Sequence, residues 1–265
     1  MTSKTFFTNR TPSPLAPTTG IFPPTFRVGV FTLSVASTIG ALEECLALER
    51  ASTQHSLSSE NGGILSPPAV PYCDFLMLKN NAGELLALCR LMRRRLGRDN
   101  SVRSSLESGR FQLSPLLTAL RYSREGLVEM GAPAFRADFD AAKAAQLMWE
   151  GVIQYLERNG LGFVVGLDSL SNQFNHFDIL PRLMEMYGLH PDLEVETHRP
   201  FYRKSISGTV PLHFDLPALP ESLVEALRRG CRLAAEPLAN EVTNRWEFIW
   251  VSSRDILDSK AGIKS

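Results

Sequence analysis

The sequence lacks the features that mark several large classes of protein. It has no excess of one charge, since its 265 residues include 28 basic and 28 acidic ones. A protein that binds nucleic acid generally needs a basic surplus, because cations must displace the counterions around the phosphates. It also has no apolar run close to the roughly 18 residues that cross a membrane as a helix. The composition therefore argues against a nucleic-acid-binding protein and against a membrane-spanning one.

Cysteines are few, and none of them forms a C-x-x-C pair: they are Cys45, Cys73, Cys89 and Cys231. This scatter predicts neither a disulfide framework nor a zinc site, and it fits the reducing cytoplasm. The five histidines form no i, i+4 metal pair, so no metal is expected. There is also no G-x-S-x-G, P-loop or G-x-G-x-x-G motif, which leaves a serine hydrolase or a dinucleotide enzyme without local support.

What is present is an ordinary globular composition, 44% hydrophobic and 21% charged, behind a proline-rich start. Residues 1–25 are predicted to be a disordered lead-in, because prolines recur there without a continuous apolar core. Residues 26–255 are expected to form one domain, since a chain of this length can bury a sizeable core. Residues 256–265 are expected to be a tail.

Apolar periodicity within that domain alternates between the two kinds of secondary structure. Strands are predicted at residues 26–35, 126–135, 163–170 and 246–253, and a β-hairpin at residues 73–95 around the turn-prone residues 80–83, although residues 84–94 alone also fit a helix. Helices are predicted at residues 41–52, 141–158 and 220–230. A further helix is predicted to follow the strand at residues 163–170 and to end at about residue 187. A hairpin followed by alternating strands and helices indicates the α/β class, with a mixed sheet covered by helices.

Four patches in this order give the chain a resemblance to a known family. They are Cys73-Asp74 with residues 83–91, then residues 111–116, then residues 128–131 with 147–155, and finally residues 230–237 with 244–251. Together they resemble the hemolysin-like GNAT acyltransferases, the group that includes ornithine-lipid N-acyltransferases. The resemblance implies a GNAT-like fold, with a mixed, mostly antiparallel sheet flanked by helices. It also implies transfer of a fatty acyl group from an acyl carrier protein or CoA thioester to the amine of an amino acid such as ornithine, with no bound cofactor.

The chain departs from the family pattern at three places. One is the first helix, where residues 47–52, Ala-Leu-Glu-Arg-Ala-Ser, have lost the aromatic residue and the first arginine of the family's Leu-Arg-Tyr-Arg-Val-Phe stretch. The family's Arg-Ser-Cys-Val-His is replaced by residues 132–136, Ala-Pro-Ala-Phe-Arg, and a glycine pair is replaced by Ala141-Ala142. These changes keep two other functions open. One is a non-catalytic GNAT-like protein that binds acyl chains or regulates, and the other is an enzyme similar to acyl-homoserine lactone synthases.

Glu129 is the candidate catalytic base. It is the lone charged residue of an apolar strand-like run, where burial would favour uptake of a proton from an ammonium group, directly or through water. The family signature places the same residue in the site. The competing interpretation is a hydrogen-bonded carboxylate with a structural role.

The junction before the long helix is the candidate donor site: Phe139, Asp140, Ala141, Ala142 and Lys143. Free backbone N–H groups at a helix N-terminus bind phosphate, and Lys143 would add a positive charge. Alanines in place of glycines restrict the approach of the backbone, which would suit the single phosphate of a carrier arm better than a pyrophosphate. Alternatively, the two alanines simply begin a helix well.

Two further groups of charged residues complete the predicted site. The basic cluster Arg93, Arg94, Arg95 and Arg98 would contact the acidic acyl carrier protein or, at the inner face of the membrane, anionic lipid, unless it is only a solvated run. Glu236 and Glu247 match family positions and would bind a cationic amino acid, unless they too are structural. The protein is thus expected to be cytoplasmic, with peripheral membrane contact as an option.

Overall fold

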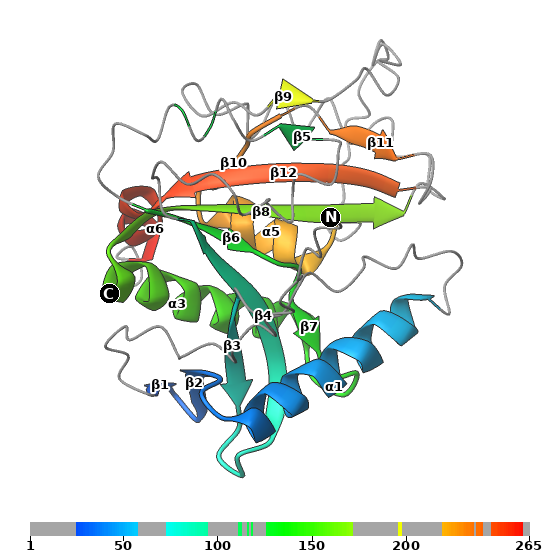
Figure 1. Cartoon of the computed structure of the whole chain (residues 1–265), viewed down its shortest axis with the longest axis vertical. Coiled ribbons are helices and arrows are strands. Elements are labelled where there is room, and N and C mark those ends of the chain that lie inside the picture. The colour runs from blue at the N-terminus through cyan, green and yellow to red at the C-terminus, as the bar shows by residue number, and fades with distance from the viewer. Residues whose placement is uncertain are drawn as a thin grey trace, which may run out of the picture.

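The structure is a computed structural model, which describes residues 25–57, 73–94, 111–112, 116, 118, 126–171, 196–197, 219–235, 237–240 and 245–261. Its centre is a twisted sheet with the strand order β1-β2-β3-β4-β6-β8-β12-β10 (Figure 1). These strands are β1 (Phe26–Val28), β2 (Phe31–Val35), β3 (Asp74–Lys79), β4 (Leu85–Arg94), β6 (Gly126–Met130), β8 (Leu161–Ser171), β12 (Arg245–Ser253) and β10 (Arg232–Leu233). Among the described strands, β6 and β8 form the one parallel pair.

Four shorter strands complete the pairing. β7 (Ala134–Phe135) pairs with β4, β11 (Leu238–Asn240) pairs with β12, and β5 (Phe111–Gln112) pairs with β9 (Glu196–Thr197) in a separate ladder. All pairs except β6–β8 are antiparallel. The predicted class, α/β with a mixed, mostly antiparallel sheet flanked by helices, is therefore confirmed.

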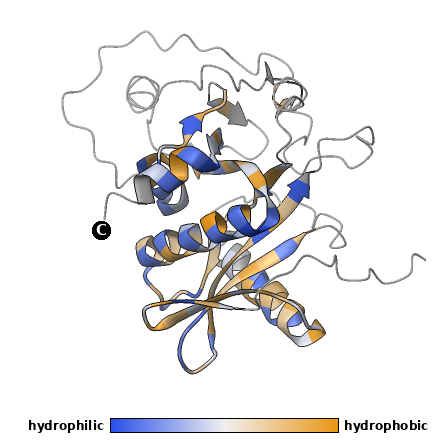
Figure 2. Cartoon of the chain, turned by 90° about the vertical axis from the view of Figure 1, so that its left-hand side faces the viewer, coloured by the Kyte–Doolittle hydropathy of each residue, from blue (hydrophilic) through white to orange (hydrophobic). Residues whose placement is uncertain are grey.

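Helices cover both faces of this sheet. α3 (Ala141–Asn159), α5 (Glu221–Arg228) and α6 (Arg254–Ala261) contribute to the large apolar core on one face. α1 (Ile39–Leu57) packs on the opposite face, over β3, β4 and β7, around Cys45 and Phe75. Figure 2 shows hydrophilic and hydrophobic residues interspersed along the helices.

The predicted hairpin and the predicted long helix are both confirmed. β3 and β4 are joined by a turn in which Gly83 adopts a φ of +81°, a conformation that favours glycine. α3 begins where the Asp140 carboxylate accepts a hydrogen bond from the Lys143 N–H, and it ends at Gly160, whose φ is +60°. Capping residues in the sequence thus set both ends of this helix.

Several predicted boundaries were wrong for local reasons. Residues 26–35 form two strands because Gly29, with a φ of +60°, turns the chain between β1 and β2. Residues 126–135 form β6 and β7, separated by a break at Pro133, which lacks an N–H for the ladder. The predicted tail begins inside α6, whose Leu257 is buried against the main core. The lead-in up to residue 24 and the helix predicted up to about residue 187 lie outside the described residues.

Removing the cap of α3 should weaken the fold measurably. Asp140→Ala leaves the Lys143 N–H without its side-chain acceptor, and we expect a loss of about 1 kcal/mol in the free energy of unfolding. Urea denaturation would measure it. Asp140→Asn, which keeps an oxygen acceptor, is the control, and an equal loss in both variants would contradict a capping role.

Candidate functional site

The sheet parts at the C-terminal end of β6. β6 pairs with β8 as far as Met130 and Gly166, and the chain then leaves β8, so that β7 pairs, among the described strands, with β4 alone. Beyond Gly166, β8 continues to Ser171 and is paired, within the described part of the chain, with β12 alone. In Figure 1, β8 and β12 run across the molecule while β3 and β4 run toward its lower end. We call the place where β6 and β8 stop pairing, after Met130 and Gly166, the seam.

Glu129 lies directly before the seam. It is the fourth residue of β6, its side chain is 2% exposed, and its register partners are Met92 of β4 and Val165 of β8. Side chains alternate along a strand, so Glu129 shares a face with Leu127, which belongs to the small core between β6, β8 and β12. That face is opposite to the one covered by α3. The prediction of an acidic side chain buried in an apolar strand is confirmed, and its catalytic role stays a prediction.

A cation lies on the same face as Glu129, and the sequence patterns gave it no role. Arg90 of β4 is placed diagonally from Glu129, because the Gly131 N–H donates to the Arg90 carbonyl oxygen at 2.9 Å. Its guanidinium donates two hydrogen bonds to the carboxylate of Glu49 on α1 and lies 5.3 Å from the centre of the Phe75 ring. This bidentate pair fixes α1 over the sheet beside the seam.

Two tryptophans and a buried acid occupy the opposite face of the seam, beneath α3. The indole of Trp250 fills the space over Gly166, and the Trp149 ring from α3 lies 5.4 Å from it, centre to centre. Asp168 accepts hydrogen bonds from Trp250 Nε1, at 2.8 Å, and from the Ser222 hydroxyl on α5. Burial raises the pKa of Asp168, although these two hydrogen bonds oppose the rise. The acid therefore ties α5, β8 and β12 together.

This buried acid predicts a pH-dependent stability. Because the pKa of Asp168 is higher in the folded chain than its ordinary value of 3.8, the folded state binds the proton more tightly than the unfolded state does. The contribution of Asp168 is then greatest at low pH and falls as the pH rises above about 4. Asp168→Asn cannot ionise, so its melting temperature relative to the wild type should increase between pH 4 and pH 7. A constant difference across that range would contradict the prediction.

The predicted donor site begins at an acidic loop. The Asp140 carboxylate accepts a hydrogen bond from the Lys143 N–H. Lys143 Nζ lies 4.9 Å from the centre of the Phe31 ring, and that ring packs edge-on against Phe139. Ala141 and Ala142 form the first turn of α3. The residues predicted to hold a donor phosphate are therefore adjacent in space, with one carboxylate among them.

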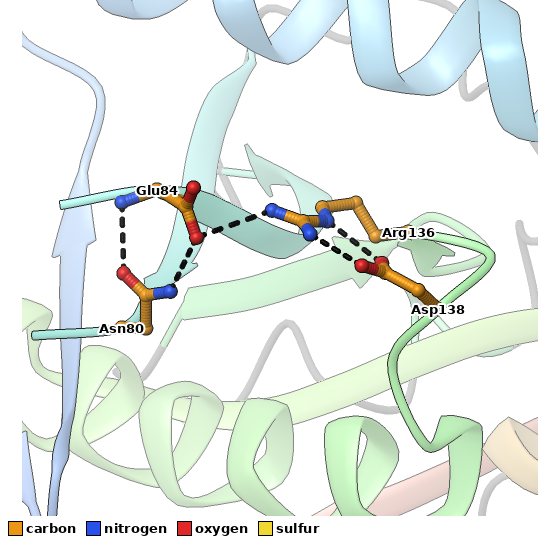
Figure 3. A network of polar contacts seen from close by, with 4 residues as sticks. All are labelled: Asn80, Glu84, Arg136 and Asp138. Atoms are coloured by element: carbon orange, nitrogen blue, oxygen red, sulfur yellow. Dashed lines mark hydrogen bonds and ion pairs between the residues drawn. The ribbon is translucent and has the colours of Figure 1, made fainter. Parts of the chain in front are cut away.

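A polar network connects this loop to the β3–β4 turn (Figure 3). Arg136 donates to Asp138 at 2.8 Å and to Glu84 at 3.4 Å, and Glu84 in turn accepts from Asn80 at 2.7 Å. The hydrogen bond from Arg136 holds the pKa of Asp138 below its ordinary value. The network keeps the loop before α3 in place, and it adds a second ionised carboxylate, that of Asp138, to the predicted donor site.

Among the remaining predicted site residues, the side chains of Arg93 and Glu247 are described. Arg93 forms an ion pair with Asp74 at 3.2 Å and donates to Asn159 at 3.1 Å, so it connects β3, β4 and the end of α3. Arg94 ends β4, but its side chain, like Arg95, Arg98 and Glu236, lies outside the described residues. The predicted carrier-protein contact of the basic cluster thus stays a prediction for all four arginines.

Glu247 lies on the same face of the sheet as Glu129 and is 5% exposed. The register Glu129–Val165–Val251 places it two strands away and four residues further along. Strand spacing and rise then separate the two α-carbons by about 16 Å. This separation applies to the α-carbons, and both carboxylates extend from the same face, so the predicted acceptor-binding role of Glu247 stays a prediction.

Other sites for chemistry find little support in the described part of the chain. The four cysteines are free, and burial raises the pKa of each thiol, that of Cys45 to about 12, so none is an ionised nucleophile at neutral pH. No group of three metal-ligating side chains occurs among the described residues. A pocket between the β1–β2 hairpin and α3, lined by Phe26, Leu33 and Tyr155 among others, does not include Glu129.

Within the same residues, no helix combines the length and the apolar character needed to cross a membrane.

Comparison with known proteins gives weak likenesses in structure. No protein-family model and no curated protein matches the sequence. The solved structure of FeeM, an N-acyl amino acid synthase from uncultured soil microbes, is 10% identical, covers 87% of this chain and 95% of its own, and gives a TM-score of 0.49. A GNAT-family acetyltransferase from Listeria monocytogenes is 9% identical with coverages of 86% and 99% and a TM-score of 0.45. The CoA-dependent acyl-homoserine lactone synthase BjaI is 14% identical with coverages of 84% and 81% and a TM-score of 0.40. At this level of similarity, the chemistry has to be argued from this chain's own residues.

Proposed function

We propose that the chain is an N-acyltransferase that moves a fatty acyl group from a thioester of acyl carrier protein or CoA to the amine of an amino acid such as ornithine. The observation that supports this most directly is the position of Glu129. It is a buried carboxylate one residue before the point where the sheet parts. A carboxylate at an opening between strands can accept a proton from a substrate that enters there.

The reaction requires a proton to leave the amine. Amino acids carry their amines as ammonium groups at neutral pH, and these are not nucleophilic. Glu129 accepts one proton, directly or through a water molecule, and the freed amine attacks the thioester carbonyl carbon. A C–N bond forms and the C–S bond breaks. The leaving thiolate takes the second proton that the nitrogen loses after the attack. The products are an N-acyl amino acid and a free thiol, so atoms and charge balance.

The seam would also hold the donor. An extended pantetheine arm carries amide groups, and beyond Gly166 the edge of β8 that does not face β12 offers backbone groups that no ladder uses among the described residues. Addition of an extended ligand to such edges is a general mode of recognition. The phosphate would lie at the start of α3, near Lys143, where helix N–H groups and a cation favour an anion.

The acceptor would approach from the face of Glu129. Arg90 lies diagonally from Glu129 on that face, and Glu49 holds its guanidinium in place. A fixed guanidinium suits a carboxylate, which every amino acid carries. The amine would then meet Glu129 while the carboxylate meets Arg90. Arg94, Arg95 and Arg98 are proposed to attract the acidic carrier protein or the inner face of the membrane.

The direct test is a search for product. We would incubate the full chain separately with long-chain acyl carrier protein and with long-chain acyl-CoA, each with a mixture of amino acids, and measure N-acyl products by mass spectrometry. We expect an N-acyl amino acid with at least one donor. Absence of product with both donors, under conditions in which the donors bind, would reject the transferase.

The acidic loop favours a second candidate function. Asp138 and Asp140 place two carboxylates where the donor phosphate is proposed to bind, and like charges oppose anion binding. A non-catalytic protein that holds acyl chains would need no phosphate site. It would bind a free fatty acid as tightly as the corresponding acyl-CoA and yield no product, whereas the transferase should prefer the thioester.

A further inference from the structure

Two indoles in contact lie on the α3 side of the seam. Gly166 is the last β8 residue paired with β6, and a Cβ placed on it would come within 2.1 Å of the Trp250 ring. The Trp149 ring packs against Trp250 at 5.4 Å with an angle of 46° between the planes. Trp149 is thus separated from Gly166, where the two strands part, by one ring.

The two indole N–H groups differ in their hydrogen bonding. Trp250 Nε1 donates to Asp168 at 2.8 Å. Trp149 Nε1 is buried, in a side chain that is 1% exposed, and it has no hydrogen-bond partner in the described structure. A buried donor without an acceptor destabilises the folded chain, and exceptions of this kind are rare enough to need a cause. An acceptor that arrives with a ligand would be such a cause.

The surroundings of Trp149 restrict the nature of that acceptor. The neighbouring core residues are apolar, among them Met148 and Val152. A carboxylate or phosphate would lose its hydration there at high cost, whereas a neutral carbonyl oxygen would lose little. The donor arm supplies such oxygens in its two amides and in its thioester. Trp149 is also eight residues after Ala141, which corresponds to about 12 Å along α3 from the proposed phosphate position.

We propose that Trp149 Nε1 donates a hydrogen bond to a carbonyl oxygen of the acyl-phosphopantetheine donor and so positions the thioester in the seam. The inference rests on the proposed function, because it requires the donor to enter between β6 and β8. Trp149 thereby gains a role in donor binding. Its position in α3 and its burial would otherwise indicate only a core residue.

The indole N–H groups can be observed one by one. The chain has three tryptophans, so a proton–nitrogen NMR spectrum of the 15N-labelled chain contains three indole signals, which tryptophan-to-phenylalanine variants assign. The ligand is a CoA that carries a long 2-oxoalkyl chain in place of the acyl group, and the same group on acyl carrier protein is used in parallel. We expect the Trp149 signal to move downfield on saturation, while the Trp250 signal changes little. A bound ligand that leaves the Trp149 signal in place would overturn the inference but not the proposed function.

Affinity gives the second readout. Trp149→Phe removes the N–H and keeps an aromatic ring, and it should weaken binding of the 2-oxoalkyl ligand about five- to tenfold, the effect of one neutral hydrogen bond. Trp246→Phe is the matched control, since Trp246 is 6% exposed in the same core and lies four residues before Trp250 on β12. Equal affinities for both variants and the wild type would overturn the inference. If neither CoA nor carrier ligand binds to the wild type, the proposed function itself fails.

A ligand without the acyl carbonyl identifies the oxygen involved. An S-alkyl-CoA keeps the two amides and lacks the acyl carbonyl. If Trp149→Phe weakens binding of the 2-oxoalkyl ligand alone, the acyl carbonyl is the acceptor. If the variant weakens both ligands equally, the acceptor is an amide carbonyl of the arm. Both results support the inference, because each places a donor carbonyl at Trp149.

Discussion

Glu129→Gln should lower kcat about 100- to 1,000-fold while donor binding stays close to that of the wild type. Glutamine has nearly the same shape as glutamate but cannot accept the proton, so the amine remains an ammonium group. General bases contribute rate factors of about this size, which correspond to 2.7–4 kcal/mol in the activation free energy. Steady-state kinetics with a saturating donor and a series of amino-acid concentrations would measure the change.

A loss of activity in this variant has to be separated from a loss of structure. Glu247→Gln is the matched control, because it makes the same substitution on the same face of the sheet at 5% exposure, against 2% for Glu129. It should retain kcat within a few-fold, since it lies about 16 Å from Glu129 by strand spacing and rise. Melting temperatures of both variants would show whether removal of a buried charge changes stability. Equal rates for Glu129→Gln and the wild type would exclude Glu129 as the base.

The parts of the fold that the sequence predicts well are those set by neighbouring residues. Asp140 and Gly160 mark the ends of α3 because a helix needs local partners at its ends, and Gly83 marks the β3–β4 turn for the same reason. Short strands were missed because their pairing depends on distant partners. β10, for example, has only two residues and exists through its pairing with β12.

The same division applies to the site. Glu129 is identifiable in the sequence, because a single charge in an apolar strand is conspicuous. The pair Arg90–Glu49 joins residues 41 positions apart, and the bond from Trp250 to Asp168 spans 82 positions. No local pattern encodes such contacts, since they arise only when α1 packs on the sheet and β12 pairs with β8.

Gly166→Ala should have the largest effect on stability. The added Cβ would lie 2.1 Å from Cζ2 of Trp250, far inside van der Waals contact. The ring has little freedom to move away, because its N–H is bonded to Asp168 and its face is covered by Trp149. We expect a loss of about 3 kcal/mol in the free energy of unfolding and a melting temperature lower by about 10 °C.

A second substitution tests whether the clash is the cause. Trp250→Leu opens space over Gly166, so the double variant should be less destabilised than the sum of the two single variants by about 2 kcal/mol. Gly40→Ala is the control, because a Cβ there meets nothing within 4 Å and alanine favours the helix, so that variant should be as stable as the wild type or more so. Additive single effects would mean that Gly166 is needed for some other reason. Coupled effects would show that the missing side chain at the seam exists to admit Trp250, whose ring in turn holds Trp149 where a donor carbonyl can reach it.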